Sequence, residues 1–288
     1  MQIVLDMERL AKGNRMDIAA KLKFVRSALY VPGSNARALE KARSLDADML
    51  IIDLEDAVPD EMKAAARSAA VDYVAAGIGG KILAIRANGA GSVHHAADMA
   101  ALNGSAADLV VLPKIEDVAE LPGLNMPLLA MIETPKGLYA AREIAAHPSV
   151  ASLIVGTNDI AAETGIKPGP NREGLELSLQ MIVLAASAQG KPRFDGVCNR
   201  LDDMNGFDAE CRQGYSYGFT GKTLIHPNQI SICNQAFGPD AAAVAEAEEL
   251  IAASRGGAQR FKGRMIESMH VEGAKMTIER SVYKMGGR

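Results

Sequence analysis

Residues 128–159 decide the fold: LLAMIETPKGLYAAREIAAHPSVASLIVGTND. The stretch starts and ends with short apolar runs at 128–132 and 152–155, and an amphipathic helical pattern at 136–146 separates them. Continuous apolar runs are typical of strands that are buried on both faces. A helix that connects two such strands is the usual crossover between parallel neighbours. The stretch therefore predicts one βαβ unit.

The same alternation extends in both directions along the chain. Eight strands with helices between most of them predict a (β/α)₈ barrel, which takes roughly 250 residues and fits within this chain of 288. We expect strands at 28–31, 49–53, 82–86, 109–112, 128–132, 152–155, 196–198 and 219–225, and helices at 36–45, 61–75, 136–146, 173–189 and 207–213.

Two segments fall outside the predicted barrel, which we place at residues 26–237. Residues 1–25 form a charged N-terminal extension with a thin apolar stripe, and we expect this extension to be helical. Residues 238–288 begin with an Ala- and Glu-rich helical pattern that ends at Gly256 and Gly257. This C-terminal helical arm is a candidate lid or oligomer contact.

The composition excludes several classes of protein. Hydrophobic residues make up 48% of the chain but aromatic residues only 4%, so the core must be mainly aliphatic. The net charge is −4 and the basic residues are spread out, which argues against a nucleic-acid-binding surface. Three Cys without a CxxC pair favour a reducing compartment. No apolar run reaches the ~18 residues that a membrane span needs, and no signal peptide is present, so we expect a cytoplasmic protein without a membrane partner.

Polar groups follow almost every predicted strand. Barrel enzymes carry their catalytic groups at the carboxyl ends of the strands. A purely structural barrel would have little reason to place polar groups there, because such groups must be solvated or paired at a cost. The pattern predicts an active site. The groups are Tyr30, Asp53, Glu55, Arg86, Asn88, Lys114, Glu133, Thr134, Asn158, Asp159, Asn199, Arg200 and His226.

Glu133 and Asp159 follow two consecutive strands, so we expect them to lie close together. Two carboxylates that face one cleft repel each other unless a cation sits between them. Mg²⁺ suits such a pair, because it takes one or two protein carboxylates and fills its octahedron with water and substrate oxygens. The alternative is that each carboxylate is solvated or salt-bridged on its loop.

Arg86 ends an apolar strand, and its guanidinium can bind a substrate carboxylate through two hydrogen bonds. A structural ion pair with Asp53 or Glu55 is an equal alternative. His226 is either a site residue or a hydrogen-bonded structural histidine, and His94 and His95 are expected to be solvated.

Eight motifs in chain order resemble the citrate lyase β-subunit-like branch of the HpcH/HpaI aldolase family. The resemblance runs from Arg26 to about Gln235 and implies a TIM barrel in which Glu133 and Asp159 hold Mg²⁺ and Arg86 holds the substrate carboxylate. The motifs are RSALYVPGSNARALEKA, DADMLIIDLEDAV, KAAAR, IRANG, VLPKIED, MIETPKG, VGTNDIA and GFTGKTLIHPNQI.

The resemblance also implies a coenzyme A thioester across the barrel mouth. Tyr30, Arg37 and Lys41 match positions that contact it, and Ile225 and His226 match a further contact. Arg37 and Lys41 are one helical turn apart and could meet one phosphate together.

The usual assembly in this family is a homotrimer or hexamer, in which the C-terminal arm closes a neighbour's site. Several malyl-CoA-type relatives carry an Asp in an M-I-D motif on that arm, where this chain has Met265-Ile266-Glu267. Glu267 either serves as the acid/base at the thioester α-carbon or is a surface helix-cap residue.

The implied reaction is the Mg²⁺-dependent cleavage of a 3-hydroxyacyl-CoA into acetyl-CoA and a 2-oxo acid, by a carbon–carbon lyase. Malyl-, β-methylmalyl-, citramalyl- and citryl-CoA are candidate substrates. The alternatives are a malate synthase or thioesterase on the same scaffold, a metal aldolase that acts without CoA, and a citrate lyase β subunit that depends on partner subunits. A non-catalytic CoA-binding protein would not need the carboxylate pair.

Overall fold

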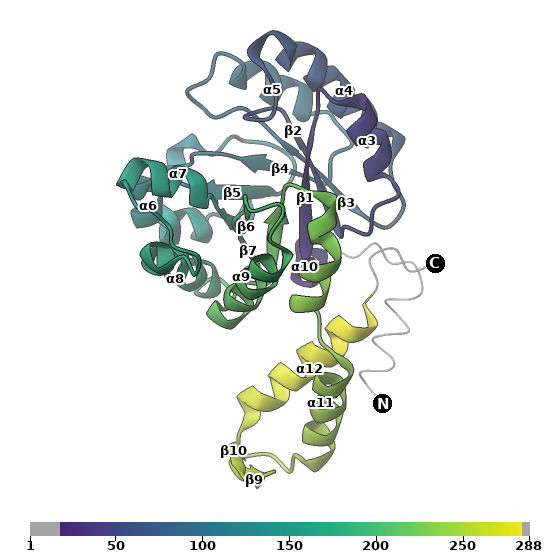
Figure 1. The fold of residues 1–288 in the computed structure, drawn as a ribbon, viewed down its shortest axis with the longest axis vertical. Helices are drawn as coiled ribbons and strands as arrows, with labels where there is room; N and C mark the ends of the chain where they lie inside the picture. Colours follow the sequence, from purple (N-terminus) through teal and green to yellow (C-terminus); the bar gives the residue numbers. More distant parts are fainter. Residues whose placement is uncertain (1–17, 284–288) are drawn as a thin grey trace.

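Eight parallel strands form a closed barrel in the computed structural model, which describes residues 18–283 (Figure 1). Each strand pairs with its neighbour in the sequence, and the last strand pairs with the first, so the barrel has no free edge. The prediction of a (β/α)₈ barrel is confirmed. The strands are β1 (Ser27–Pro32), β2 (Met49–Asp53), β3 (Ile82–Arg86), β4 (Leu109–Leu112), β5 (Leu128–Ile132), β6 (Val150–Val155), β7 (Arg193–Asp195) and β8 (Gly221–Leu224).

Helices surround the barrel on its outer side (Figure 1). Local signals fix where they begin: Thr134 accepts a hydrogen bond from the Gly137 amide, and Pro135 occupies the first turn of the helix after β5. Between β4 and β5 the described chain forms only a 3₁₀ turn, Val118–Glu120. The α-helices are α3 (Ala36–Ala42), α4 (Lys63–Ala76), α5 (His95–Leu102), α6 (Pro135–Ala146), α7 (Thr157–Thr164), α8 (Glu176–Ser187), α9 (Met204–Tyr217) and α10 (Ile230–Ala236).

Alternate side chains along each strand fill two separate cores. One set packs between the strands and the helices, and the other fills the barrel interior. The interior set includes Met49 and Ile51 of β2, Ile82 and Ala84 of β3, and Leu129 and Met131 of β5. When each series is continued by two residues toward the carboxyl end, the side chain facing the barrel axis becomes Asp53, Arg86 or Glu133. The period of two thus brings these three charges into one place.

Short helices close the opposite, amino-terminal end of the barrel. In α2 (Ile18–Lys21) and the following 3₁₀ turn (Leu22–Phe24), Leu22 belongs to the barrel-interior core, as does Val25 directly after them. The predicted helical extension therefore has helix from Ile18 onward, and its first seventeen residues lie outside the described part.

The C-terminal arm consists of α11 (Ala241–Ala253) and α12 (Ser268–Val282), which pack side by side and extend away from the barrel (Figure 1). A small hairpin of β9 (Gln259–Phe261) and β10 (Arg264–Ile266) connects them. We did not predict this hairpin. Its turn residues Lys262 and Gly263 both have positive φ, as a two-residue hairpin turn requires.

The predicted position of β7 is wrong by three residues. We expected 196–198, but the strand is Arg193–Asp195. Asp195 is fully buried and pairs with Lys222 of β8 and Arg172, so a charged residue stands where an apolar one was expected. The same Lys222 lies within β8, which is shorter than the predicted 219–225.

No helix within residues 18–283 is long and apolar enough to cross a membrane.

Candidate active site

A cavity of about 280 Å³ lies at the carboxyl ends of the barrel strands. Its wall brings together residues that lie in or just after seven of the eight strands, all except β4, together with α7. The sequence predicted a site at this end of the barrel. The lining residues are Tyr30, Asp53, Asp56, Ala57, Arg86, Met131, Glu133, Val155, Gly156, Thr157, Asn158, Asp159, Val197, Asn199, Thr223 and Ile225.

Arg86 is held by carboxylates of the loop after β2. Asp53 and Arg86 are direct partners in the β2–β3 register, and both Nε and Nη2 of Arg86 donate to Asp53 at 2.7 Å. Its Nη1 lies 2.9 Å from Glu55 Oε2 and donates to Asp56 at 3.3 Å. Of the two interpretations of Arg86, the structure contains the ion pair with Asp53. Because a guanidinium has five donors, one Nη2 hydrogen is left for another acceptor.

Tyr30 covers one face of this guanidinium. The centre of its ring lies 4.8 Å from Cζ of Arg86, a cation–π distance. Its hydroxyl is buried and has no hydrogen-bond partner within residues 18–283. Burial raises the pKa of Tyr30 above its usual range. A buried hydroxyl without a partner beside a cavity can donate a hydrogen bond to a ligand.

Glu133 is buried at the end of β5, with 2% of its surface exposed. Its Oε1 accepts a hydrogen bond of 2.8 Å from the backbone amide of Lys114. Its other oxygen lies against Gly156, where a Cβ atom would come within 2.4 Å of both Cβ and Oε2 of Glu133. Only glycine fits at position 156 next to this carboxylate.

The site carries an excess of negative charge. Burial, followed by the nearby carboxylates of Glu55 and Asp159, raises the pKa of Glu133 to about 8. Burial also raises the pKa of Glu55 to about 7, although Arg86 acts in the opposite direction. These carboxyl groups would ionise more easily if a further cation were present.

Asp159 lies in the first turn of α7, and 35% of its side chain is exposed. Lys114 Nζ is 3.5 Å from its Oδ1. Burial lowers the pKa of Lys114, but Asp159, Glu55 and the other nearby carboxylates raise it above its usual value. Asp159 and Glu133 therefore face the same cavity and share contacts with one lysine.

The two carboxylates fit a hard divalent cation such as Mg²⁺. The described residues contain no group of three or more His, Cys, Asp or Glu side chains arranged to hold a metal. Zinc sites usually need three or four such ligands, whereas Mg²⁺ accepts one or two carboxylates and keeps its other positions for water and substrate. Glu133, buried among like charges, is a suitable first ligand, and Asp159 at the cavity wall is a second.

The other predicted residues are distributed around this cavity. Ile225 lines it. His226 does not line it, and its Nδ1 accepts a hydrogen bond from the Asn228 amide at the start of a 3₁₀ turn, which is the structural alternative. Arg37 and Lys41 are exposed on α3, outside the cavity wall.

Glu267 lies at the start of α12, and its amide donates to His270 Nδ1. It is on the arm and is not among the residues that line the cavity of its own chain.

The sequence did not predict a polar network around Lys63 and Asn88, close to Arg86. Lys63 is buried and donates to the carbonyls of Leu54 and Glu55 and to Oδ1 of Asn88. His95, which we expected to be solvated, is half-buried, and its Nδ1 is 2.8 Å from the carbonyl oxygen of Asn88. This prediction was wrong because a backbone carbonyl oxygen that is close only in the fold binds the ring. The network holds the loop that carries Glu55 in place.

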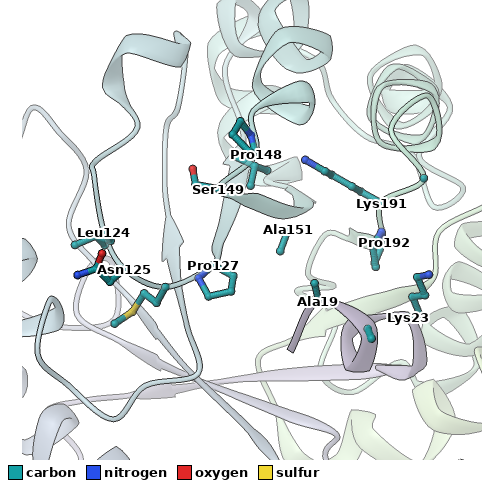
Figure 2. A pocket seen from close by; sticks show the side chains of 14 residues that line it. Ala19, Lys23, Leu124, Asn125, Pro127, Pro148, Ser149, Ala151, Lys191 and Pro192 are labelled. Carbon is teal, nitrogen blue, oxygen red and sulfur yellow. The ribbon is translucent and has the colours of Figure 1, made fainter. Parts of the chain in front are cut away.

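A larger cavity of about 550 Å³ lies at the opposite end of the barrel (Figure 2). It is bounded by α2 and by the segments that precede β5, β6 and β7. Lys191, which lines it, is occupied by the carbonyl oxygens of Ala145 and His147. Because barrel enzymes work at the carboxyl ends of their strands, the smaller cavity is the candidate active site.

Comparison with known proteins identifies the family. The model of the HpcH/HpaI aldolase/citrate lyase family matches residues 26–227. The chain belongs to this family. The prediction of an enzyme of the lyase class is confirmed by this membership and by the neighbours described next.

Three known proteins resemble the chain over most of its length. It is 40% identical to a (3S)-malyl-CoA thioesterase of Cereibacter sphaeroides, over 89% of this chain and 94% of the relative. It is 35% identical to a citrate lyase subunit beta-like protein of Deinococcus radiodurans, over 84% and 92%. The CitE protein of Mycobacterium tuberculosis, solved in complex with magnesium, acetoacetate and coenzyme A, is 31% identical with a TM-score of 0.79, over 91% of this chain and all of that one.

Proposed function

We propose that the protein is a Mg²⁺-dependent lyase that cleaves a 3-hydroxyacyl-CoA of the malyl-CoA type into acetyl-CoA and a 2-oxo acid. The single observation that carries the proposal is the buried Glu133, whose carboxyl faces Glu55 and Asp159 and has a pKa of about 8. Such a site favours a divalent cation. The CitE neighbour bound to magnesium and coenzyme A supports this choice of metal and substrate class.

Mg²⁺ held by Glu133 and Asp159 would act as a Lewis acid toward the carboxylate and hydroxyl oxygens of the substrate. The chain itself supplies orientation and charge. The remaining Nη2 hydrogen of Arg86 is available to the substrate carboxylate, while Asp53 fixes the plane of the guanidinium. The unpartnered hydroxyl of Tyr30 offers a second donor beside it.

The carbon–carbon step needs a base and an acid. Loss of the hydroxyl proton lets the bond between the α- and β-carbons of the thioester break, and its electron pair passes to the acetyl thioester fragment. A proton delivered to that α-carbon completes acetyl-CoA. We assign this proton to Glu267 of a neighbouring copy, because Glu267 stands on the arm outside the cavity of its own chain. The assignment requires a homo-oligomer, and the family resemblance makes a homotrimer or hexamer the expected assembly.

Arg37 and Lys41 are the proposed contacts of the CoA phosphates. Both side chains are exposed, and none of the ion pairs of residues 18–283 involves either of them. Two unpaired cations one turn apart on α3 suit a phosphate group. Replacing both with Gln should raise KM for the thioester while kcat changes little.

A thioesterase is the second candidate, favoured by the relative that shares 40% identity over 89% of the chain. In that reaction water attacks the thioester carbonyl, and the carbon–carbon bond stays intact. The cavity geometry is compatible with both outcomes, so the products must decide.

The test is a product assay with purified protein, malyl-CoA and Mg²⁺. Equal amounts of acetyl-CoA and a 2-oxo acid would support the lyase, whereas free CoA and malate without a 2-oxo acid would favour the thioesterase. Both reactions should be lost in Glu133→Gln and Asp159→Asn. Turnover that persists in both variants would contradict the proposed metal site. Malyl-CoA turnover also separates this enzyme from an aldolase that acts without CoA and from a subunit that needs partners.

A further inference from the structure

Lys114 contacts both proposed metal ligands. It follows β4 and has a left-handed backbone with φ of 54°, which is rare for a residue with a side chain. Its amide donates to Glu133 Oε1 at 2.8 Å, and its Nζ lies 3.5 Å from Asp159 Oδ1. One residue thus connects carboxylates that come from two different strands. A strained backbone of this kind persists where the surroundings impose it, and this often occurs at functional sites.

Lys114 is the basic residue that can neutralise the carboxylates of Glu133 and Asp159. Arg86 is the only basic residue among those that line the cavity within residues 18–283, and its charge is paired with Asp53, Glu55 and Asp56. Within residues 18–283, Lys114 is the only basic residue within ion-pair distance of Asp159, and Glu133 has none. The side chain of Lys114 is 47% exposed, so its ammonium can leave without disturbing the core.

We propose that the Lys114 ammonium is an internal counter-ion of the metal site, which a divalent cation displaces when it binds to Glu133 and Asp159. The inference rests on the proposed metal site and adds a regulatory property to it. The metal must break the contact between Lys114 and Asp159 before it can enter, so metal binds weakly by itself. Oxygens of a bound substrate carboxylate, which provide further metal ligands and attract the freed ammonium, would strengthen metal binding. Metal and substrate should therefore bind cooperatively.

Titration calorimetry of the full chain with MgCl₂ tests the proposal. Lys114→Gln removes the competing charge, and we expect it to bind Mg²⁺ about two- to fivefold more tightly than wild type, the range that an ion pair of this exposure allows. Lys114→Arg keeps the charge and should keep the wild-type affinity. Lys136→Gln is the matched control, because Lys136 is also an exposed lysine but pairs with Glu116, and it should change nothing.

The same titrations repeated with pyruvate as a 2-oxo acid probe measure the cooperativity. In wild type, saturating pyruvate should increase Mg²⁺ affinity, and this increase should shrink in Lys114→Gln. An unchanged or weaker Mg²⁺ affinity in Lys114→Gln, with wild-type binding that Asp159→Asn abolishes, would overturn the inference and leave the metal site standing. Absence of Mg²⁺ binding in wild type would instead refute the metal site itself. A gain of affinity is a result that a purely structural role of Lys114 would not produce.

Discussion

Gly156 lets β6 approach Glu133 so closely that the carboxylate occupies the space where a side chain would begin. We predict that Gly156→Ala pushes Glu133 out of place and weakens Mg²⁺ binding at least about tenfold, because metal ligands tolerate only small displacements. Calorimetry of the folded variant measures the loss. Gly104→Ala, at a position with open space around the Cα, is the control and should bind like wild type. Normal binding by Gly156→Ala would mean that Glu133 can bind metal from another conformation.

Glu133 also predicts how stability depends on pH. Its pKa rises from 4.5 in the unfolded chain to about 8 in the fold, so the folded state favours the neutral carboxyl. The neutral Glu133 carboxyl therefore contributes its full stabilisation of the folded protein below pH 4.5. This contribution to the free energy of unfolding is lost as the pH rises toward 8. In metal-free protein, Glu133→Gln should therefore be within about 1 kcal/mol of wild type at pH 5 but more stable by roughly 4–5 kcal/mol at pH 8.5.

Urea unfolding in the presence of EDTA at both pH values measures this difference between variant and wild type. Added Mg²⁺ should reduce it at pH 8.5, because a metal stabilises the ionised carboxylate. An equal difference at the two pH values would show that Glu133 does not titrate in this range.

For single residues, the sequence predicted which side chains lie together at the site. It did not predict the hydrogen bonds and ion pairs that position them. Glu133, Asp159 and Arg86 follow from strand ends and from the period of two. Lys114 was only one of many strand-end groups, because its left-handed backbone and its bond to Glu133 have no local signal. The ion pair of Arg86 with Asp53 depends on the register between β2 and β3, which one sequence does not specify.

Among the elements, β7 and β8 depend on buried charges. Lys222 is fully buried between Asp195 and Glu210, and Arg172 pairs with the same two carboxylates. We predict that Lys222→Met destabilises the protein by about 3–5 kcal/mol, because it leaves a carboxylate uncompensated in the core. Urea unfolding measures the loss. Arg212→Ala removes an exposed ion pair with Asp208 on α9 and should cause no measurable change.

The same buried charges explain where element prediction succeeded and where it failed. Strands β2 to β5 are apolar runs in which at most the last residue is charged, and their predicted bounds agree with the structure. In β7 the charged ends of Arg193–Asp195 hide the strand, since the partners that neutralise Asp195 are distant in sequence. The hairpin of β9 and β10 was not predicted, since Lys262-Gly263 between two short runs is a weaker turn signal than Asn-Gly or Asp-Gly.

At the scale of the whole molecule, the position of Glu267 predicts that each site needs two chains. Glu133→Gln and Glu267→Gln should each be inactive alone. When the two are dissociated, mixed in equal amounts and reassembled, some sites combine an intact barrel with an intact arm, and about a quarter of the wild-type activity should return. Activity assays before and after reassembly measure this. Failure to recover activity, with mixed oligomers demonstrated, would place the acid within a single chain.

Near the base of the barrel, the rings of Phe24 and Tyr283 stack with centroids 4.1 Å apart, and Arg280 donates to the carbonyl oxygen of Thr220. The beginning and the end of the described fold therefore meet at one point, on the side opposite the cavity. Because Phe24 and Tyr283 are in contact, a short peptide linker could join the two ends of the described fold. New termini could then be opened elsewhere in the chain. The exposed Gly256-Gly257 turn of the arm is a natural place to cut. Such a circular permutant would begin with the β9–β10 hairpin and α12 and would still build the same barrel.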